Sequence, residues 1–254
     1  MKIAQIISLL EEFAPLDLQE KWDNSGIQVG DVTQNVRGIL LCLDVTEEVI
    51  DEALEMDCNL IVSHHPLLFK PLQSLTGKTY IERGVIKACK NDLVVYSAHT
   101  NLDNVVGGVN FRLAEKIGLL DVQPLNLEGA GVVGQLPAEE DEESFLQRIK
   151  SIFQLQSLKH SPFTGRKIRE VALCGGSGAF LIKDVIAYGA DVFLTGEAKY
   201  NDYYDVENRI LLAVLGHYES ELCTKELFFD IISKKIPNFA IYFSNANANP
   251  VNYM

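Results

Sequence analysis

Residues 39–65 read "ILLCLDVTEEVIDEALEMDCNLIVSHH" and decide the fold class of this chain. Two short, continuously apolar runs are separated by a segment whose apolar residues recur at helical spacing. Such runs are typical of strands buried on both faces, and Thr46 is placed to cap the intervening helix. A strand, a helix and a strand in this order predict a mostly parallel sheet covered by helices, which is an α/β fold.

The same alternation extends through most of the chain. Further helices are expected over 3–13, 79–92, 108–119, 179–189, 200–208 and 218–236, and further strands within 26–30, 93–97, 170–176, 190–198, 209–217 and 239–245. Residues 128–155 instead predict a strand, an acidic turn and a helix. Because the composition changes near residue 125, we expect a first α/β domain over 1–125, completed by 232–254, and a second over 126–231.

The two halves of the chain resemble each other. Residues 171–197, "VALCGGSGAFLIKDVIAYGADVFLTGE", align with 39–65 without a gap, and His65 then falls opposite Glu197. The next strand in each half ends in a histidine followed four residues later by a carboxylate. Apolar strands match easily by chance, but the repeated histidine and carboxylate favour a duplication. We therefore expect two related α/β/α domains with a pseudo-two-fold relation.

Histidines and carboxylates gather where strands end. In open α/β sheets, ligands bind outside the carboxyl ends of the strands. Four of the five histidines and three carboxylates are expected there: His64, His65, His99, His217, Asp103, Glu197 and Glu221. A single histidine at a strand end is often a structural residue, but a set of this kind suits Zn, Mn or Fe. With five or six ligands, two divalent ions are more natural than one.

Local spacing gives two expectations about these side chains. His64 and His65 are adjacent in an extended loop, so we expect them to point to opposite sides and to serve one metal each. His217 and Glu221 are four residues apart, which would place them on one face of a helix that begins directly after Gly216.

Other motifs leave alternatives open. The turn "CGGSG" at 174–178 could cradle a phosphate, but it lacks the full dinucleotide and Walker patterns, so a plain tight turn is equally consistent. Lys199 could meet an anion or a carboxylate. Trp22 is expected to anchor the polar loop "WDNSG" to the core.

Composition narrows the partners. The net charge of −13 disfavours nucleic acid, because phosphate backbones require a basic footprint. No apolar run reaches the roughly 20 residues of a membrane span. Five cysteines without a CxxC pair are typical of thiols in a reducing compartment, so we expect a cytoplasmic protein.

Six segments taken together resemble one family. They are "WDNSGIQVG", "SHHP", "AHTNLD", "CGGSG", "GADVFLTGEAKY" and "GHYESE", and they span residues 22–221. The chain is similar to the Nif-three-like dinuclear metal-centre proteins, whose members are often named type 2 GTP cyclohydrolase I. Its length resembles the short form of that family.

The resemblance implies two α/β domains meeting around a two-metal site and a ring-shaped homohexamer. It implies His64, His65, Asp103, His217 and Glu221 as metal ligands, with Glu221 bridging and His99 near the site or an optional ligand. Family members often carry histidine where this chain has Asn201, which puts proton transfer from that position in doubt.

The leading hypothesis is a dinuclear metal-dependent hydrolase that opens a purine nucleotide ring and releases formate. His99 and Glu197 are the candidates for moving protons. The hydrolytic class follows from the ligand set, whereas GTP follows only from the resemblance. The alternatives are a non-catalytic metal-binding or scaffold protein acting through its oligomer, and a two-metal nucleotide phosphoesterase.

Overall fold

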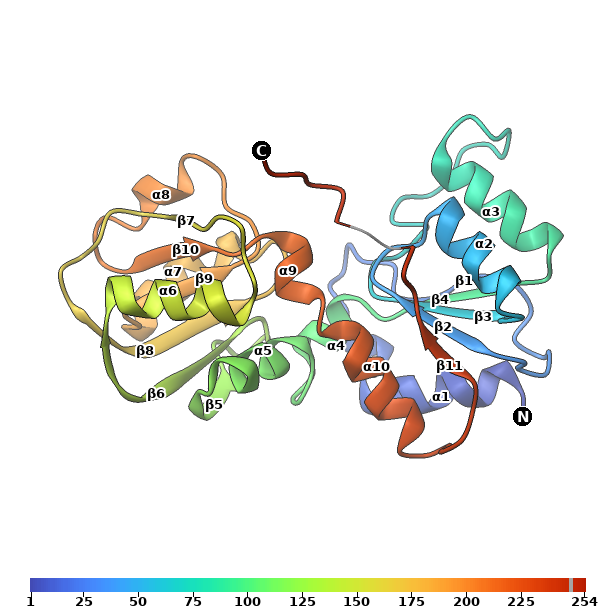
Figure 1. Ribbon diagram of the computed structural model, residues 1–254, viewed down its shortest axis with the longest axis horizontal. Helices are drawn as coiled ribbons and strands as arrows, with labels where there is room; N and C mark the ends of the chain where they lie inside the picture. The colour runs from blue at the N-terminus through green and yellow to red at the C-terminus, as the bar shows by residue number, and fades with distance from the viewer. Residues whose placement is uncertain (247–248) are drawn as a thin grey trace. The chain divides into compact units, whose positions relative to one another are not determined.

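The computed structural model describes residues 1–246 and 249–254 (Figure 1). The chain divides into two compact units, 1–105 with 224–250 and 106–223 with 251–254. These divisions lie upstream of the expected boundaries, because α5 (Val109–Ile117) packs on the second sheet and α10 (Thr224–Ser233) packs on α1 and β2 in the first unit. Among the residues described, no helix is both long and apolar enough to cross a lipid bilayer.

The first unit is built on one sheet with the strand order β1-β4-β3-β2-β11. Four of its strands are parallel, and β1 pairs antiparallel with β4 at the edge. Helices cover both faces, with α2 and α3 on one side and α1 and α10 on the other (Figure 1). The elements are α1 (Ile3–Phe13), η1 (Leu16–Leu18), β1 (Gly26–Val29), β2 (Ile39–Cys42), α2 (Glu47–Glu55), β3 (Leu60–Ser63), α3 (Tyr80–Lys90), β4 (Val94–Ser97), α4 (Thr100–Asn104) and β11 (Ile241–Phe243).

The second unit is built on a mixed sheet with the order β5-β6-β8-β9-β10-β7. Its three central strands, β8 to β10, are parallel, and the others are antiparallel. Alternate residues of β6, β8 and β9 face either α5 and α6 or η2 and α7, so both faces are buried. The remaining elements are β5 (Leu120–Pro124), β6 (Val132–Asp141), α6 (Glu142–Ile152), β7 (Lys159–His160), β8 (Lys167–Cys174), η2 (Ala179–Leu181), α7 (Ile182–Tyr188), β9 (Val192–Thr195), α8 (Asp202–Asp205), β10 (Leu211–Val214) and α9 (His217–Glu221).

Strand register confirms the predicted relation between the halves. β2 pairs with β3 from Ile39↔Leu60 to Cys42↔Ser63, and β8 pairs with β9 from Val171↔Val192 to Cys174↔Thr195. These pairs occupy the positions that the gapless alignment makes equivalent. The predicted mixed and mostly parallel α/β fold, with two units of related topology, is therefore confirmed.

The third strand corrects one part of that match. Val94 of β4 and Leu211 of β10 occupy equivalent positions, because they pair with Leu60 and Val192. Counting forward from these residues makes His99 equivalent to Gly216, so His99 and His217 are displaced by one position. The two histidines end their strands in similar places but are not register equivalents.

Three local predictions also differ from the structure. The acidic segment expected as a turn continues strand β6 to Asp141, which pairs with Lys167 across the ladder. The helix expected over 218–236 is divided into α9 and α10. Strand β5 was not expected, since its residues are largely exposed and show no apolar alternation.

Candidate metal centre

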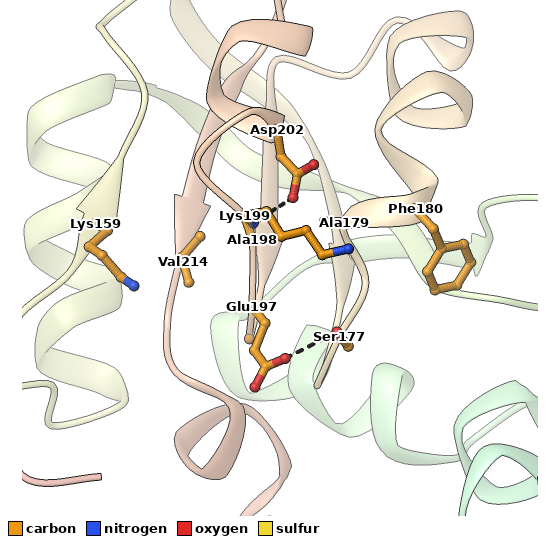
Figure 2. A pocket seen from close by; sticks show the side chains of 10 residues that line it. Lys159, Ser177, Ala179, Phe180, Glu197, Ala198, Lys199, Asp202 and Val214 are labelled. Atoms are coloured by element: carbon orange, nitrogen blue, oxygen red, sulfur yellow. Dashed lines mark hydrogen bonds between the residues drawn. The ribbon is translucent and has the colours of Figure 1, made fainter.

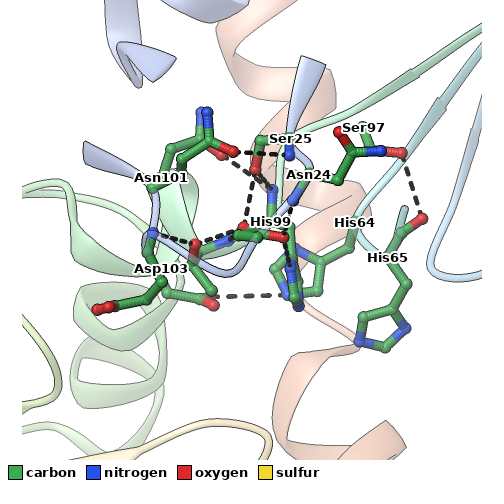
Figure 3. A network of polar contacts seen from close by, with 12 residues as sticks. Asn24, Ser25, His64, His65, Ser97, His99, Asn101 and Asp103 are labelled. Atoms are coloured by element: carbon green, nitrogen blue, oxygen red, sulfur yellow. Dashed lines mark hydrogen bonds and ion pairs between the residues drawn. The ribbon is translucent and has the colours of Figure 1, made fainter. Parts of the chain in front are cut away.

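Three imidazoles of the first unit converge beyond the ends of two neighbouring parallel strands (Figure 3). His64 and His65 follow β3, and His99 follows β4. Each offers a ring nitrogen, and these nitrogens lie within 4.8 Å of one another. Such a spacing would allow the rings to bind one metal ion or two neighbouring ones.

The expectation that His64 and His65 point to opposite sides is wrong. Their ring centroids are only 5.0 Å apart. The reason lies in the backbone, where the N–H of His64 donates to Cys42 O and the N–H of His65 donates to Leu43 O. Consecutive N–H groups of a regular strand point in opposite directions, so the chain has already left the strand geometry here and brings both rings to one side.

Each ring is oriented by an oxygen atom of the protein. The Nδ1 atoms of His64, His65 and His99 lie 2.9 Å from Ala98 O, 2.7 Å from Asp44 Oδ1 and 2.7 Å from Asp23 Oδ1. A carbonyl or ionised carboxylate oxygen can only accept, so Nδ1 carries the hydrogen and Nε2 carries the lone pair in the neutral ring. Histidines that bind metals typically have this arrangement. His64 Nε2 also lies 3.6 Å from Asp103 Oδ1.

Asp23 is a buried anion that fixes His99. Its carboxylate accepts hydrogen bonds from Ser25 Oγ at 3.0 Å, from the Thr100 N–H at 3.1 Å and from the Thr100 hydroxyl. Burial raises the pKa of Asp23, but hydrogen bonds from His99 and Thr100 and the charge on His99 outweigh it and hold this pKa well below its ordinary value. The loop "WDNSG" therefore serves to orient an imidazole.

Trp22 does not anchor its loop in the core, contrary to the prediction. Its side chain is 59% exposed and lies against Phe69, with the ring centroids 5.9 Å apart. Polar bonds hold the loop instead, including one from Asn24 Nδ2 to Leu68 O at 2.7 Å.

In the second unit, His217 links two carboxylates. His217 begins α9, and its Nε2 lies 3.1 Å from Glu221 Oε2 four residues later, so the two share one helical face as predicted. His217 Nδ1 lies 3.1 Å from Oε1 of Glu197, which follows β9. Glu221 is buried, and the absence of a side chain at Gly176 makes room for it, because a Cβ there would overlap the Glu221 carboxylate.

The glycine-rich turn is a tight turn and not a phosphate cradle. Its N–H groups at Gly175, Gly176 and Gly178 already donate to Asn110 Oδ1, Ser220 Oγ and Thr195 Oγ1, at 2.9, 3.0 and 3.0 Å. The turn therefore uses these donors to join β8 to neighbouring segments. Asn201 lies just before the short helix α8 and is exposed.

Two carboxylates that orient the imidazoles, Asp23 and Asp44, were not among the predicted site residues. Asp44 lies just beyond the end of β2, so the strand-end argument that selected the histidines would also have found it. Asp23 is far from its partner in the sequence, and only the conspicuous "WDNSG" loop could have drawn attention to it.

Fold and site together define a two-unit α/β protein with candidate metal-binding clusters at strand ends. The family model described as Duf34/NIF3 (NGG1p interacting factor 3) matches residues 1–250. The chain belongs to this family, and the resemblance inferred from the motifs is confirmed.

Relatives and solved structures agree with this assignment. The chain is 40% identical over 230 residues to a protein of Clostridium perfringens named GTP cyclohydrolase 1 type 2 homolog, with 87% of each chain covered. It is 33% identical over 260 residues to a protein of the same name from Lactococcus lactis subsp. lactis, with 98% of each covered. A crystal structure of Staphylococcus aureus hypothetical protein SA1388 has a TM-score of 0.92 at 29% identity and covers 100% of this chain and 99% of that one.

Proposed function

We propose that this protein is a dinuclear metal-dependent hydrolase acting on a purine nucleotide, in the manner of type 2 GTP cyclohydrolase I. The observation that carries the proposal is the set of three clustered imidazoles, each held through Nδ1 by a protein oxygen. Histidines with merely structural roles do not require three ring nitrogens to lie within 4.8 Å of one another. As the sequence analysis predicts, the ligands would be His64, His65, Asp103, His217 and Glu221.

The donor set fits the proposed ions. Imidazole nitrogens with carboxylate oxygens suit Zn, Mn or Fe, whereas Ca and Mg prefer oxygen alone. When bound, two such ions lower the pKa of a water molecule and polarise the bond to be broken. The Asp44 carboxylate keeps His65 in the tautomer that can bind, and the buried Asp23 fixes the position of the His99 ring beside the ligands.

His99 and Glu197 are the proposed proton carriers. His99 is partly exposed and is held by Asp23, so its ring can exchange a proton without losing its position. Glu197 is exposed and lies within hydrogen-bonding distance of His217. The nucleotide substrate is supported by the names of the Clostridium and Lactococcus relatives, which are GTP cyclohydrolase 1 type 2 homologs.

Metal reconstitution followed by product analysis tests the proposal. The protein is stripped with a chelator, reloaded separately with Mn, Zn or Fe, and incubated with GTP and a nucleotide panel. Formate release is the expected result. Release of inorganic phosphate would replace the cyclohydrolase with a phosphoesterase. Bound metal without turnover of any nucleotide would favour a metal-binding or scaffold protein. A His160→Ala variant should behave like the unaltered protein in each assay, because His160 lies in β7, outside both clusters.

The expected homohexamer and cytoplasmic location are further parts of the proposal. Light scattering coupled to gel filtration would measure the subunit number directly. A mass well below six chains at micromolar concentration would contradict the hexamer.

A further inference from the structure

A cleft of about 570 Å³ opens in the second unit (Figure 2). It lies at the carboxyl ends of the parallel strands β9 and β10 and beside β7, with Glu197, Val214 and Lys159 among its lining residues. Its volume falls within the range of about 300–1,000 Å³ typical of small-molecule sites. The hydrolase proposal assigns this cleft no ligand, although Glu197 also contacts His217.

Two lysines, Lys159 and Lys199, line the cleft together with the carboxylates of Glu197 and Asp202. Among the residues that the structure describes, no carboxylate lies within ion-pair distance of Lys159 or Lys199. Other lysines of this acidic chain do form such pairs, as Lys87 does with Asp51 and Lys167 with Asp141. Two ammonium groups without carboxylate partners on one cleft, in a chain with 35 acidic and 22 basic residues, favour an anionic ligand.

The carboxylates of the cleft are held by protein donors. Asp202 Oδ2 accepts from the Lys199 N–H at 2.6 Å, and Glu197 Oε2 accepts from Ser177 Oγ at 3.1 Å. In Figure 2 the Glu197 carboxylate lies at the lower end of the view, with Lys199 and Phe180 above it and Lys159 on the side opposite Phe180. Each of these carboxylates thus has a hydrogen-bond donor of its own within the protein.

An apolar rim completes the arrangement. Phe180 is 70% exposed although it lines the cleft, and Ala179 and Ala198 lie beside it. An exposed aromatic ring in a cleft with two lysines suits a ligand with both a flat ring and an anionic group. The glycine-rich turn has committed three of its N–H groups to protein acceptors, so side-chain ammonium groups would have to recognise the anion.

We infer that this cleft binds a nucleoside phosphate, with Lys159 and Lys199 contacting the phosphate oxygens and Phe180 packing on the base. The inference rests on the proposed function, because it names the part of the second unit that would hold that substrate. It also specifies something that the metal ligands do not, namely a dependence of affinity on the phosphate groups.

Calorimetric titration of the chelator-treated protein tests the inference without turnover. The probes are GTP, guanosine and inorganic triphosphate. Lys199→Gln and Lys159→Gln should each weaken GTP and triphosphate about tenfold or more, which is the usual effect of losing a hydrogen bond to a charged group. Guanosine affinity should be unchanged by either substitution and should fall in Phe180→Ala. Lys183→Gln removes an exposed lysine outside the cleft and is the matched control.

Three results would overturn the inference. The first is failure of GTP and triphosphate to bind. The second is equal GTP affinity in the wild type and in a variant that carries both Lys159→Gln and Lys199→Gln. The third is a loss of GTP affinity in Lys183→Gln as large as in the cleft variants. Phosphate-dependent binding to a protein that never turns GTP over would contradict the hydrolase proposal but support the inference about the cleft. Turnover of GTP with a KM that neither lysine substitution changes would support the hydrolase proposal but contradict the inference about the cleft.

Discussion

The pairing of β2 with β3 in the first unit has the same register as the pairing of β8 with β9 in the second. Different residues nevertheless follow β3 and β9. In the first unit, β3 is followed by His64 and His65. At the equivalent positions after β9, the second unit has Gly196 and Glu197. The comparison shows that the two units share a backbone arrangement but differ in the residues that follow their strands.

Packing explains why the second unit cannot carry the same histidines. A Cβ at Gly196 would lie 2.6 Å from Gly176 O and 2.6 Å from Ser220 Oγ, so the position has no room for any side chain. His64, its counterpart, is fully buried and bonds to Ala98 O. The turn after β8 comes too close to β9 for an imidazole to fit.

The carboxylates also come from different places. In the first unit Asp44, just after β2, reaches His65. Its equivalent is Gly176, and there the space is taken by the carboxylate of Glu221, which comes from α9. Each unit thus places a carboxylate beside an imidazole, but from a different segment of the chain.

The largest expected effect is on metal affinity, when a histidine of the first unit is replaced. His65→Ala removes a proposed ligand, so metal affinity should fall by more than about 100-fold, beyond the loss usual for a supporting residue. Elemental analysis of the purified variant measures metal per chain, and His160→Ala should keep the wild-type content. Retention of two metals per chain by His65→Ala would contradict the ligand assignment.

The next prediction tests the packing at Gly196. Gly196→Ala should destabilise the second unit by about 2–3 kcal/mol, because its Cβ meets backbone that cannot move aside. Gly84→Ala is the control, since Gly84 lies in helix α3 without left-handed backbone and a Cβ there meets nothing closer than 3.4 Å. Urea denaturation measures both. Equal losses would mean that steric exclusion is not what keeps histidine out of the second unit.

Much of this comparison could be predicted from the sequence. Polar residues that follow short apolar runs predict where the strands end, and ligands bind at strand ends in α/β sheets. The strand-end argument therefore selected the histidines, Asp103, Glu197 and Glu221. The structure brings His64, His65 and His99 together and places His217 beside Glu197 and Glu221. The gapless alignment matched the register of β2–β3 and β8–β9.

What could not be predicted depends on contacts between distant residues. The rings of His64 and His65 converge because of two backbone hydrogen bonds, to the last residue of β2 and to Leu43 just after it, which no periodicity reveals. Asp23 reaches His99 across 76 positions in the sequence. Strand β5 is defined by its antiparallel pairing with β6, since its exposed residues carry no strand pattern of their own.

A third prediction concerns the room that Gly176 leaves for Glu221. Gly176→Ala should fold, because the nearest atoms belong to the flexible end of Glu221, but the displaced carboxylate should weaken metal binding about 10- to 100-fold. Gly118→Ala is matched to it, with a φ of +81° against +58° and no atom within 4 Å of the added Cβ. Metal titration should separate the two variants although their backbone strain is similar. Equal affinities would show that Glu221 is not needed where it lies.

The smallest expected difference is between the two hydroxyls that end β3 and β9. Ser63 Oγ donates to His65 O at 2.9 Å and is also within hydrogen-bonding distance of Ser97 Oγ, at 2.7 Å. Thr195 Oγ1 instead accepts from the Gly178 N–H at 3.0 Å. Thr195→Val should cost about 1–3 kcal/mol, because a buried N–H loses its acceptor. Ser63→Ala should cost less than about 1 kcal/mol, because Ser97 Oγ still reaches His65 O at 3.2 Å. Urea midpoints measure both, and a larger loss in Ser63→Ala would mean that the histidine loop, not the glycine turn, depends more on its strand-end hydroxyl.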